Sequence, residues 1–144
     1  MSLLDTVAEL VKKRPLDTRA VEDAFDVALR QDADNTNPYI QRFLAFRRPA
    51  ELRSVEVRVP QGAATRKGPI VVVDVDGEAT NIKQADVLAQ FGEKPAVEVP
   101  TPAQPPDSPV YLSYPQPWGT LRFGFARPST ELLTSVVIDS DKLP

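Results

Sequence analysis

The chain of 144 residues contains neither cysteine nor histidine. Without cysteine it can form no disulfide, and it has no thiolate nucleophile and no cysteine-bound metal site. Without histidine it lacks the commonest metal ligand and the side chain best suited to proton transfer near neutral pH. The sequence also has no phosphate-binding loop, nucleophile elbow or dinucleotide-binding fingerprint. We therefore expect a protein that is not an enzyme and that holds neither a cofactor nor a metal ion.

Long apolar runs are missing too. The longest run, residues 70–73, is far shorter than the roughly 20 apolar residues of a membrane-spanning helix. The amino terminus has no basic segment followed by an apolar one, so it does not resemble a signal peptide. The expected location is the periplasm or cell envelope if a signal peptide has been removed, and the cytoplasm otherwise.

Positive charge is spread thinly along the chain. The net charge is −3, and Lys and Arg occur in small, separate clusters, which is atypical of proteins that bind nucleic acid. Hydrophobic residues make up 42% of the chain and charged residues 26%, close to the values of ordinary globular proteins. The length suits a single domain over residues 1–144, with its own hydrophobic core.

Two helices are predicted near the amino terminus. Residues 2–13 form an amphipathic pattern that Ser2 can cap, and residues 18–30 form a second pattern that Asp17 can cap. The buried side of the second helix is expected to consist of Val21, Phe25, Ala28 and Leu29.

The polar segment 31–38 is predicted to be a solvated turn between helix and strand. It carries Asp32 and Asp34 with nearby asparagines, a composition that also suits calcium. The EF-hand pattern requires a glycine and a closing glutamate at fixed offsets, and neither occurs here. No calcium site is therefore predicted.

Three strands are predicted between residues 39 and 75. Residues 39–46 and 52–59 alternate between apolar and polar side chains, which is the period of two expected of a strand with one buried face. Residues 70–75 are almost all β-branched, and they predict a central strand that is covered on both faces.

A third helix and a proline-rich connector are predicted next. The helix spans residues 80–91, with Thr80 or Asn81 as its cap and Gly92 at its end. Its apolar side is expected to consist of Ala85, Leu88 and Phe91. The connector, residues 99–109, is rich in proline and is expected to be extended and stiff.

The carboxyl-terminal part reads as strands. Residues 120–126 and 132–139 alternate, and their short linker predicts an antiparallel hairpin. The predicted fold class is therefore α+β: amino-terminal helices packed on a mainly antiparallel β-sheet, with a further short helix midway. Helices followed by strands occur twice along the chain, which suggests a structural duplication even though the residues themselves do not repeat.

Residues 80–140 combine a helix ending in Gly-x-x-Pro with following strands that carry aromatic, glycine and alternating apolar positions. The residues of this pattern are Val87, Phe91, Gly92, Pro95, Tyr114, Gly119, Leu121, Phe123, Phe125, Leu133 and Val136. The pattern covers under half of the chain and resembles one unit of the fold shared by β-lactamase-inhibitor proteins and small outer-membrane-assembly lipoproteins. The resemblance implies a binding or inhibitory module and transfers no active site.

Carboxylates are the remaining candidates for chemistry. Asp74 and Asp76 flank Val75, so on a strand both would point to the same face. With Glu78 they can hold a metal or act as acid and base in a small-ligand-binding or hydrolytic α+β domain. The Asp76–Gly77 pair also favours a hairpin turn, and an acidic strand end that leaves the core is the favoured interpretation of all three carboxylates.

Aromatic side chains provide the candidate partner-binding residues. Tyr111, Tyr114 and Trp118 lie among prolines, and Arg122 lies on the following predicted strand. Tyr, Trp and Arg contribute much of the energy of protein interfaces. An exposed Trp118 would contact a partner, whereas a buried one would cover an end of the core.

These observations favour a non-catalytic binding protein whose partner is another protein. The most concrete form is a bacterial immunity or inhibitor protein of the periplasm that occludes a secreted enzyme or toxin by inserting a loop such as 99–119. The alternatives are a structural or assembly accessory of the envelope, or the small-ligand-binding or hydrolytic domain that would use Asp74 or Asp76.

Overall fold

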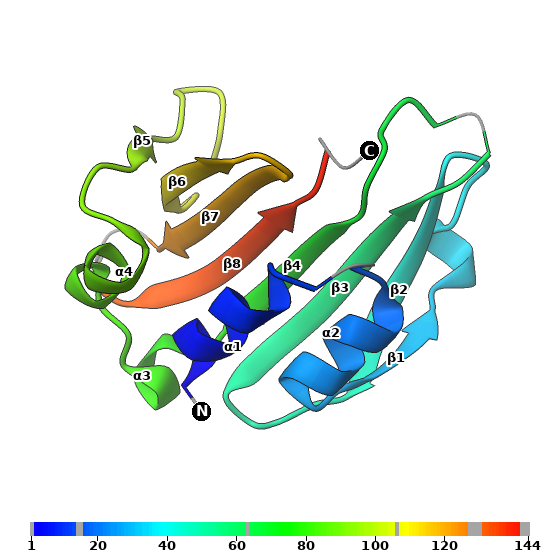
Figure 1. The fold of residues 1–144 in the computed structure, drawn as a ribbon, viewed down its shortest axis with the longest axis horizontal. Helices are drawn as coiled ribbons and strands as arrows, with labels where there is room; N and C mark the ends of the chain where they lie inside the picture. Colours follow the sequence, from blue (N-terminus) through cyan, green and yellow to red (C-terminus); the bar gives the residue numbers. More distant parts are fainter. Residues whose placement is uncertain (1, 14–15, 63, 106, 127–130, 142–144) are drawn as a thin grey trace.

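The computed structural model describes residues 2–13, 16–62, 64–105, 107–126 and 131–141 (Figure 1). Its helices are α1 (Leu3–Leu10), α2 (Thr18–Phe25), the 3-10 helix η1 (Ala33–Asn35), α3 (Gly77–Thr80) and α4 (Gln84–Phe91). Its strands are β1 (Ala28–Gln31), β2 (Ile40–Arg47), β3 (Leu52–Pro60), β4 (Ile70–Val75), β5 (Ala96–Glu98), β6 (Val110–Gln116), β7 (Gly119–Phe125) and β8 (Leu133–Asp139). The α+β class predicted from the sequence is confirmed.

The strands form one sheet in the order β1-β2-β3-β4-β8-β7-β6-β5, and every neighbouring pair is antiparallel. The order is symmetric about the central pair β4–β8, whose register is centred on Val72 opposite Val137. Two α-helices followed by four strands therefore occur twice among the described residues, as α1–β4 and as α3–β8. The suggested helix–strands duplication is present in the fold.

One face of the sheet carries the hydrophobic core, and we call it the covered face. Side chains alternate between the two faces along a strand, so the pairing register identifies which residues share a face. Two central rows of the covered face are Val55, Val73, Val136, Phe123 and Leu112, and Val57, Val71, Ile138, Leu121 and Tyr114. All ten are buried, and they belong to the same apolar cluster as Val7 of α1, Val21 of α2 and Val87 of α4. Figure 1 shows α1 and α2 lying over the β1–β4 half of the sheet.

The caps predicted for the first two helices are confirmed, but the second helix is shorter than predicted. Ser2 Oγ accepts a hydrogen bond from the Asp5 amide, and Asp17 Oδ1 accepts one from the Ala20 amide. α2 ends at Phe25 because Asp26 adopts a left-handed conformation, which Asp tolerates better than most residues.

Ala28 and Leu29 consequently lie in β1 and not on the predicted helical stripe. The Leu29 amide donates to a carboxylate oxygen of Glu22, which ties the new strand back to the helix. The polar segment after β1 therefore joins two strands, whereas a turn between helix and strand was predicted.

The predictions around residue 80 need four corrections. Asp76 accepts hydrogen bonds from the amides of Glu78 and Ala79 and begins α3, so Asp76–Gly77 is a helix cap and not a hairpin turn. Asn81 ends α3 in a left-handed conformation and does not cap α4.

The next helix, α4, starts only after Lys83, whose amide donates to the Asp86 carboxylate. The residues of α4 that pack against the core are Val87, Leu88 and Phe91, and the predicted Ala85 is exposed.

Two further predictions differ from the structure. β4 is central, but only Val71, Val73 and Val75 are buried, so the strand is covered on one face and not on both. The proline-rich connector is not continuously extended, because backbone hydrogen bonds close turns at residues 101–104 and 105–108. The β7–β8 hairpin is antiparallel as predicted, and its linker, residues 127–130, lies outside the described residues.

Candidate functional site

The helices α1, α2 and α4 pack against the core on the covered face, and we call the second face of the sheet the open face. Its three central rows are Ser54, Asp74, Ser135, Gly124 and Tyr111; Glu56, Val72, Val137, Arg122 and Ser113; and Arg58, Ile70, Asp139, Thr120 and Pro115. Most of these side chains remain at least partly exposed, in contrast to the rows of the covered face. The open face is therefore a polar surface with a small apolar centre at Val72 and Val137.

An arginine–carboxylate network fixes the β2–β3 part of the open face. Arg42 lies directly opposite Arg58, and Glu56 bridges the two guanidinium groups through one carboxylate oxygen, at 2.6 Å from each Nε. Arg42 also contacts Asp32, with Nη1 3.2 Å from Oδ2. The Glu56 side chain is 12% exposed, so this network is shielded from water more than an ordinary surface ion pair.

The charges of this network shift two pKa values. Burial raises the pKa of Glu56, but the hydrogen bonds from Arg42 and Arg58 outweigh burial and lower it overall. The hydrogen bond to Glu56 also raises the pKa of Arg42. Both groups are therefore held in their charged forms, with their side chains in fixed positions.

A second network occupies the other half of the open face. Asp139 accepts hydrogen bonds from Arg66, in the β3–β4 connection, and one oxygen lies 3.5 Å from Arg122 Nη1. Arg122 Nε lies 3.3 Å from an oxygen of Glu98 on β5. Each half of the face thus presents arginine side chains that carboxylates hold in place.

The four residues predicted to bind a partner lie in three different environments. Tyr111 on β6 and Arg122 on the neighbouring strand β7 both lie on the open face. Tyr114 lies on the covered face at 7% exposure, stacked edge-on against Phe123, and its hydroxyl donates to the Gly92 carbonyl. The structure therefore brings together Tyr111 and Arg122, and it places Tyr114 in the core.

Trp118 occupies the turn between β6 and β7. Its ring is partly buried and packs against the core, so it covers one end of the covered face while leaving part of its surface accessible. The loop predicted over residues 99–119 is not one loop, because its second half contains β6. A partner would accordingly meet a strand face at Tyr111 and a loop only up to Pro109.

Asp74 and Asp76 do not form a pair. Asp74 lies on the open face, where its carboxylate accepts a hydrogen bond of 2.8 Å from the Ser54 hydroxyl. Asp76 caps α3, and its Oδ1 lies 3.8 Å from the Arg53 guanidinium. Among the described residues there is no group of three or more acidic side chains placed to hold a metal ion.

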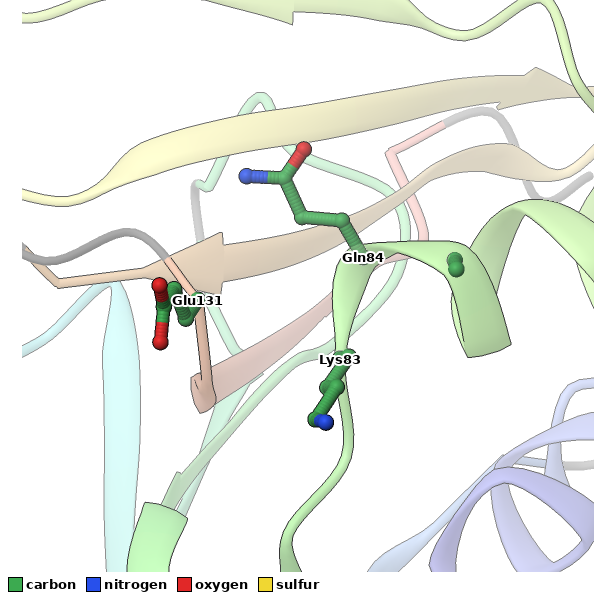
Figure 2. Close-up of a pocket in the computed structure, with 4 residues that line it drawn as sticks. Lys83, Gln84 and Glu131 are labelled. Carbon is green, nitrogen blue, oxygen red and sulfur yellow. The ribbon is translucent and has the colours of Figure 1, made fainter.

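A hollow of about 430 Å³ lies at the start of α4 (Figure 2). It is lined by Lys83, Gln84, Ala85 and Glu131. The polar ends of the three labelled side chains point in different directions and do not converge on one position. This hollow therefore offers no set of groups arranged around a common ligand atom.

A third region, at the β1–β2 edge, was missed by the sequence analysis. Phe46 is 54% exposed, and the Arg30 guanidinium lies 4.9 Å from the centre of its ring. Both line a hollow of about 440 Å³ together with Asp32 and Asp34. The alternation of residues 39–46 groups Phe46 with Ile40, Leu44 and Arg42, and it does not show which side is buried. In the structure the opposite side packs against the core, through Phe43 and Ala45.

The network residues Arg42 and Glu56 carried a weaker signal. Each is a charged residue at an alternating position of a predicted strand, which indicates a polar face but not which strands meet. Their contact depends on the β2–β3 register, which places Glu56 beside Arg42 and Arg58.

Comparisons with known proteins gave no match: no protein-family model, no curated protein and no solved structure is similar to this chain. No helix in the described part of the chain is long and apolar enough to span a membrane.

Proposed function

We propose that the chain is a non-catalytic protein that binds another protein through the open face of its sheet. The observation that carries this proposal is the contrast between the two faces: helices cover one, while the other is lined by ordered arginine networks around the partly exposed Val72 and Val137. A sheet face of this kind suits a broad contact surface.

The composition of the open face supports a protein partner. Arginine and tyrosine are enriched where protein interfaces derive most of their binding energy, and Tyr111 and Arg122 lie on neighbouring strands of this face. Carboxylates already hold Arg42, Arg58 and Arg122 in place, so less side-chain freedom is lost when a partner binds. Val72 and Val137 provide apolar area between the two networks.

For the partner we propose a secreted enzyme or toxin, which the chain would occlude as an immunity or inhibitor protein of the bacterial cell envelope. The resemblance of residues 80–140 to β-lactamase-inhibitor-like units supports this class. The repeated order of two helices and four strands is consistent with two such units side by side. The mode of binding differs from loop insertion, because the open face and not the proline-rich connector provides most of the contact.

The test is an affinity capture with two matched variants. Val137→Glu places a bulky charge at the centre of the open face, and Ala89→Glu places the same charge on the exposed side of α4. Wild type and both variants are immobilised, after thermal unfolding has shown that all three fold, and are incubated with lysate and secretome of the source organism.

The proposal predicts that wild type and Ala89→Glu capture the same secreted enzyme or toxin and that Val137→Glu does not. The purified partner should then lose its activity when mixed with an equimolar amount of the chain. Equal capture by all three proteins would contradict the use of the open face. Capture of envelope assembly components through the open face would replace the inhibitor by the accessory role.

A further inference from the structure

Among the described residues, Asp74 is the one carboxylate in the three central rows of the open face that forms no ion pair. The other two, Glu56 and Asp139, each contact two arginines. Asp74 has a hydrogen bond from the neutral Ser54 hydroxyl, and no ion pair with any described residue. Of these three carboxylates, only Asp74 therefore lacks a paired arginine in the described part of the chain.

Asp74 lines a cleft of about 300 Å³ at one end of the open face. The other lining residues are Arg53, Val72, Val75, Pro109, Tyr111, Thr134 and Ser135. Tyr111 lies in the same row of the sheet as Asp74, with Ser135 and Gly124 between them. The cleft thus combines a carboxylate and an aromatic ring within a mainly polar lining, to which Val72, Val75 and Pro109 add apolar surface.

The bottom of this cleft contains an unsatisfied polar group. Ser135 is 5% exposed, and its hydroxyl has no hydrogen-bond partner among the described residues. Gly124 makes room for it, because a Cβ at this position would collide with Ser135 Oγ and would lie 2.9 Å from Cε1 of the Tyr111 ring. A buried hydroxyl without a partner costs stability unless a ligand or water satisfies it.

We propose that this cleft receives a cationic side chain, an arginine of the protein partner. A guanidinium group pairs with a carboxylate through charge-assisted hydrogen bonds and stacks on aromatic rings, so Asp74 and Tyr111 satisfy both of its preferences. A small shift of the Tyr111 ring gives the same group access to the Ser135 hydroxyl, whose oxygen can accept a hydrogen bond. This inference rests on the proposed function and names the chemistry that one end of the open face recognises.

Arg53 is the one cationic residue among those that line this cleft, and it forms no ion pair with Asp74. Its guanidinium lies 3.8 Å from Asp76, on a side chain that is 69% exposed. An ion pair this exposed is weak, so Arg53 stays free to move and competes with an incoming cation through its charge. Removal of Arg53 should therefore strengthen cation binding at Asp74.

The cleft is tested with a small probe before any partner is known. The ¹⁵N-labelled chain is titrated with N-acetyl-arginine amide, and amide shifts are followed by NMR. N-acetyl-citrulline amide, which has the same shape without the charge, is the control probe. Asp74→Asn is compared with Asp34→Asn, because Asp34 lines the hollow that contains the exposed Phe46 and so provides a matched carboxylate near another aromatic ring.

The proposal predicts saturable shifts at residues 72–75, 111 and 134–135 with the arginine probe. Binding should be about tenfold weaker for Asp74→Asn, because a hydrogen bond to a charged group is lost. Asp34→Asn should leave binding unchanged, Arg53→Ala should strengthen it, and the citrulline probe should bind far less. Equal binding to wild type and Asp74→Asn, or shifts centred on Phe46, would overturn the proposal.

The same variants separate this inference from the proposed function. If Val137→Glu loses the captured partner while Asp74→Asn binds it with unchanged affinity, the open face binds a protein and the arginine site is wrong. If the arginine probe binds at Asp74 but no partner needs the open face, the cleft is a site for a free small cation, which also contradicts the proposal of a partner's arginine. Loss of partner affinity in Asp74→Asn, with Asp34→Asn unchanged, supports it.

Discussion

The two faces of the sheet are built from the same strands, but they differ in the burial and the charge of their side chains. On β7, Leu121 and Phe123 are buried in the core, while Thr120 and Arg122, which alternate with them, remain partly exposed on the open face. The covered face contains no charged side chain in its central rows, and the open face contains charges in all three. The contrast shows how a period of two separates the residues that stabilise the fold from those available for recognition.

The covered face should dominate stability. Phe123 is fully buried and contacts the rings of Phe91 and Tyr114, with ring centres 4.8 and 6.0 Å away. Phe123→Ala should reduce the free energy of unfolding by about 3–5 kcal/mol, because it removes buried apolar surface and leaves a cavity. Urea denaturation measures the change. Thr120→Ala, on the same strand but on the open face, is the control, and an equal loss in both variants would break the distinction between the faces.

Gly124 lies in a packed part of the open face, beside the buried Ser135 and the partly buried Tyr111. Gly124→Ala introduces a methyl group against Ser135 and the Tyr111 ring, so one of them must move. Overpacking of this kind costs about 1–3 kcal/mol, which thermal unfolding will detect. Combining it with Ser135→Ala should recover part of the loss, and no recovery would show that the strain lies elsewhere.

The Glu56 network makes stability depend on pH. The pKa of Glu56 is lowered below its ordinary value of 4.5, so the ionised form stabilises the folded chain. This contribution is fully present above pH 4.5 and is lost as the pH falls through the lower folded-state pKa.

Glu56→Gln should therefore lower the free energy of unfolding by about 1–2 kcal/mol at pH 7, through the loss of charged hydrogen bonds. The difference between wild type and Glu56→Gln should shrink as the pH is lowered from 7 to 3, in parallel urea titrations. A difference that stayed constant with pH would show that the charge of Glu56 does not stabilise the fold through its pairs with the arginines.

Tyr114→Phe gives the smallest expected effect and sharpens the assignment of Tyr114 to the core. The variant keeps the ring against Phe123 and removes only the hydroxyl that donates to the Gly92 carbonyl, over 2.8 Å. The expected loss is about 1 kcal/mol, the net contribution of one hydrogen bond. Partner capture should be unchanged, and a large loss of binding with little loss of stability would move Tyr114 from the core to the interface.

Much of the fold was predictable because local signals agreed with the tertiary structure. Ser2 and Asp17 cap their helices as predicted, and the alternating residues of β3, β7 and β8 pair as antiparallel strands. Two errors at helix boundaries occurred where one residue ends a helix by adopting a left-handed conformation. Asp26 and Asn81 are both left-handed, and neither differs in the sequence from an ordinary polar residue on a helix.

The candidate site was less predictable than the fold. Tyr111 and Tyr114 are equally aromatic in the sequence, and only the alternation of β6 separates them into open and covered faces. The contact of Asp139 with Arg66 joins residues that are 73 positions apart, so it depends on the central β4–β8 pair and on the β3–β4 connection. Pairings at this distance follow from strand order, which a single sequence does not specify.

The most direct test of the open face as the binding surface is site-specific photo-crosslinking. A photoreactive phenylalanine analogue is introduced at position 137, in the centre of the open face, or at position 89, on the exposed side of α4. The account predicts that position 137 forms a covalent adduct with the protein that affinity capture identifies, and that position 89 forms none. An adduct from position 89 at equal or higher yield, with none from position 137, would contradict it.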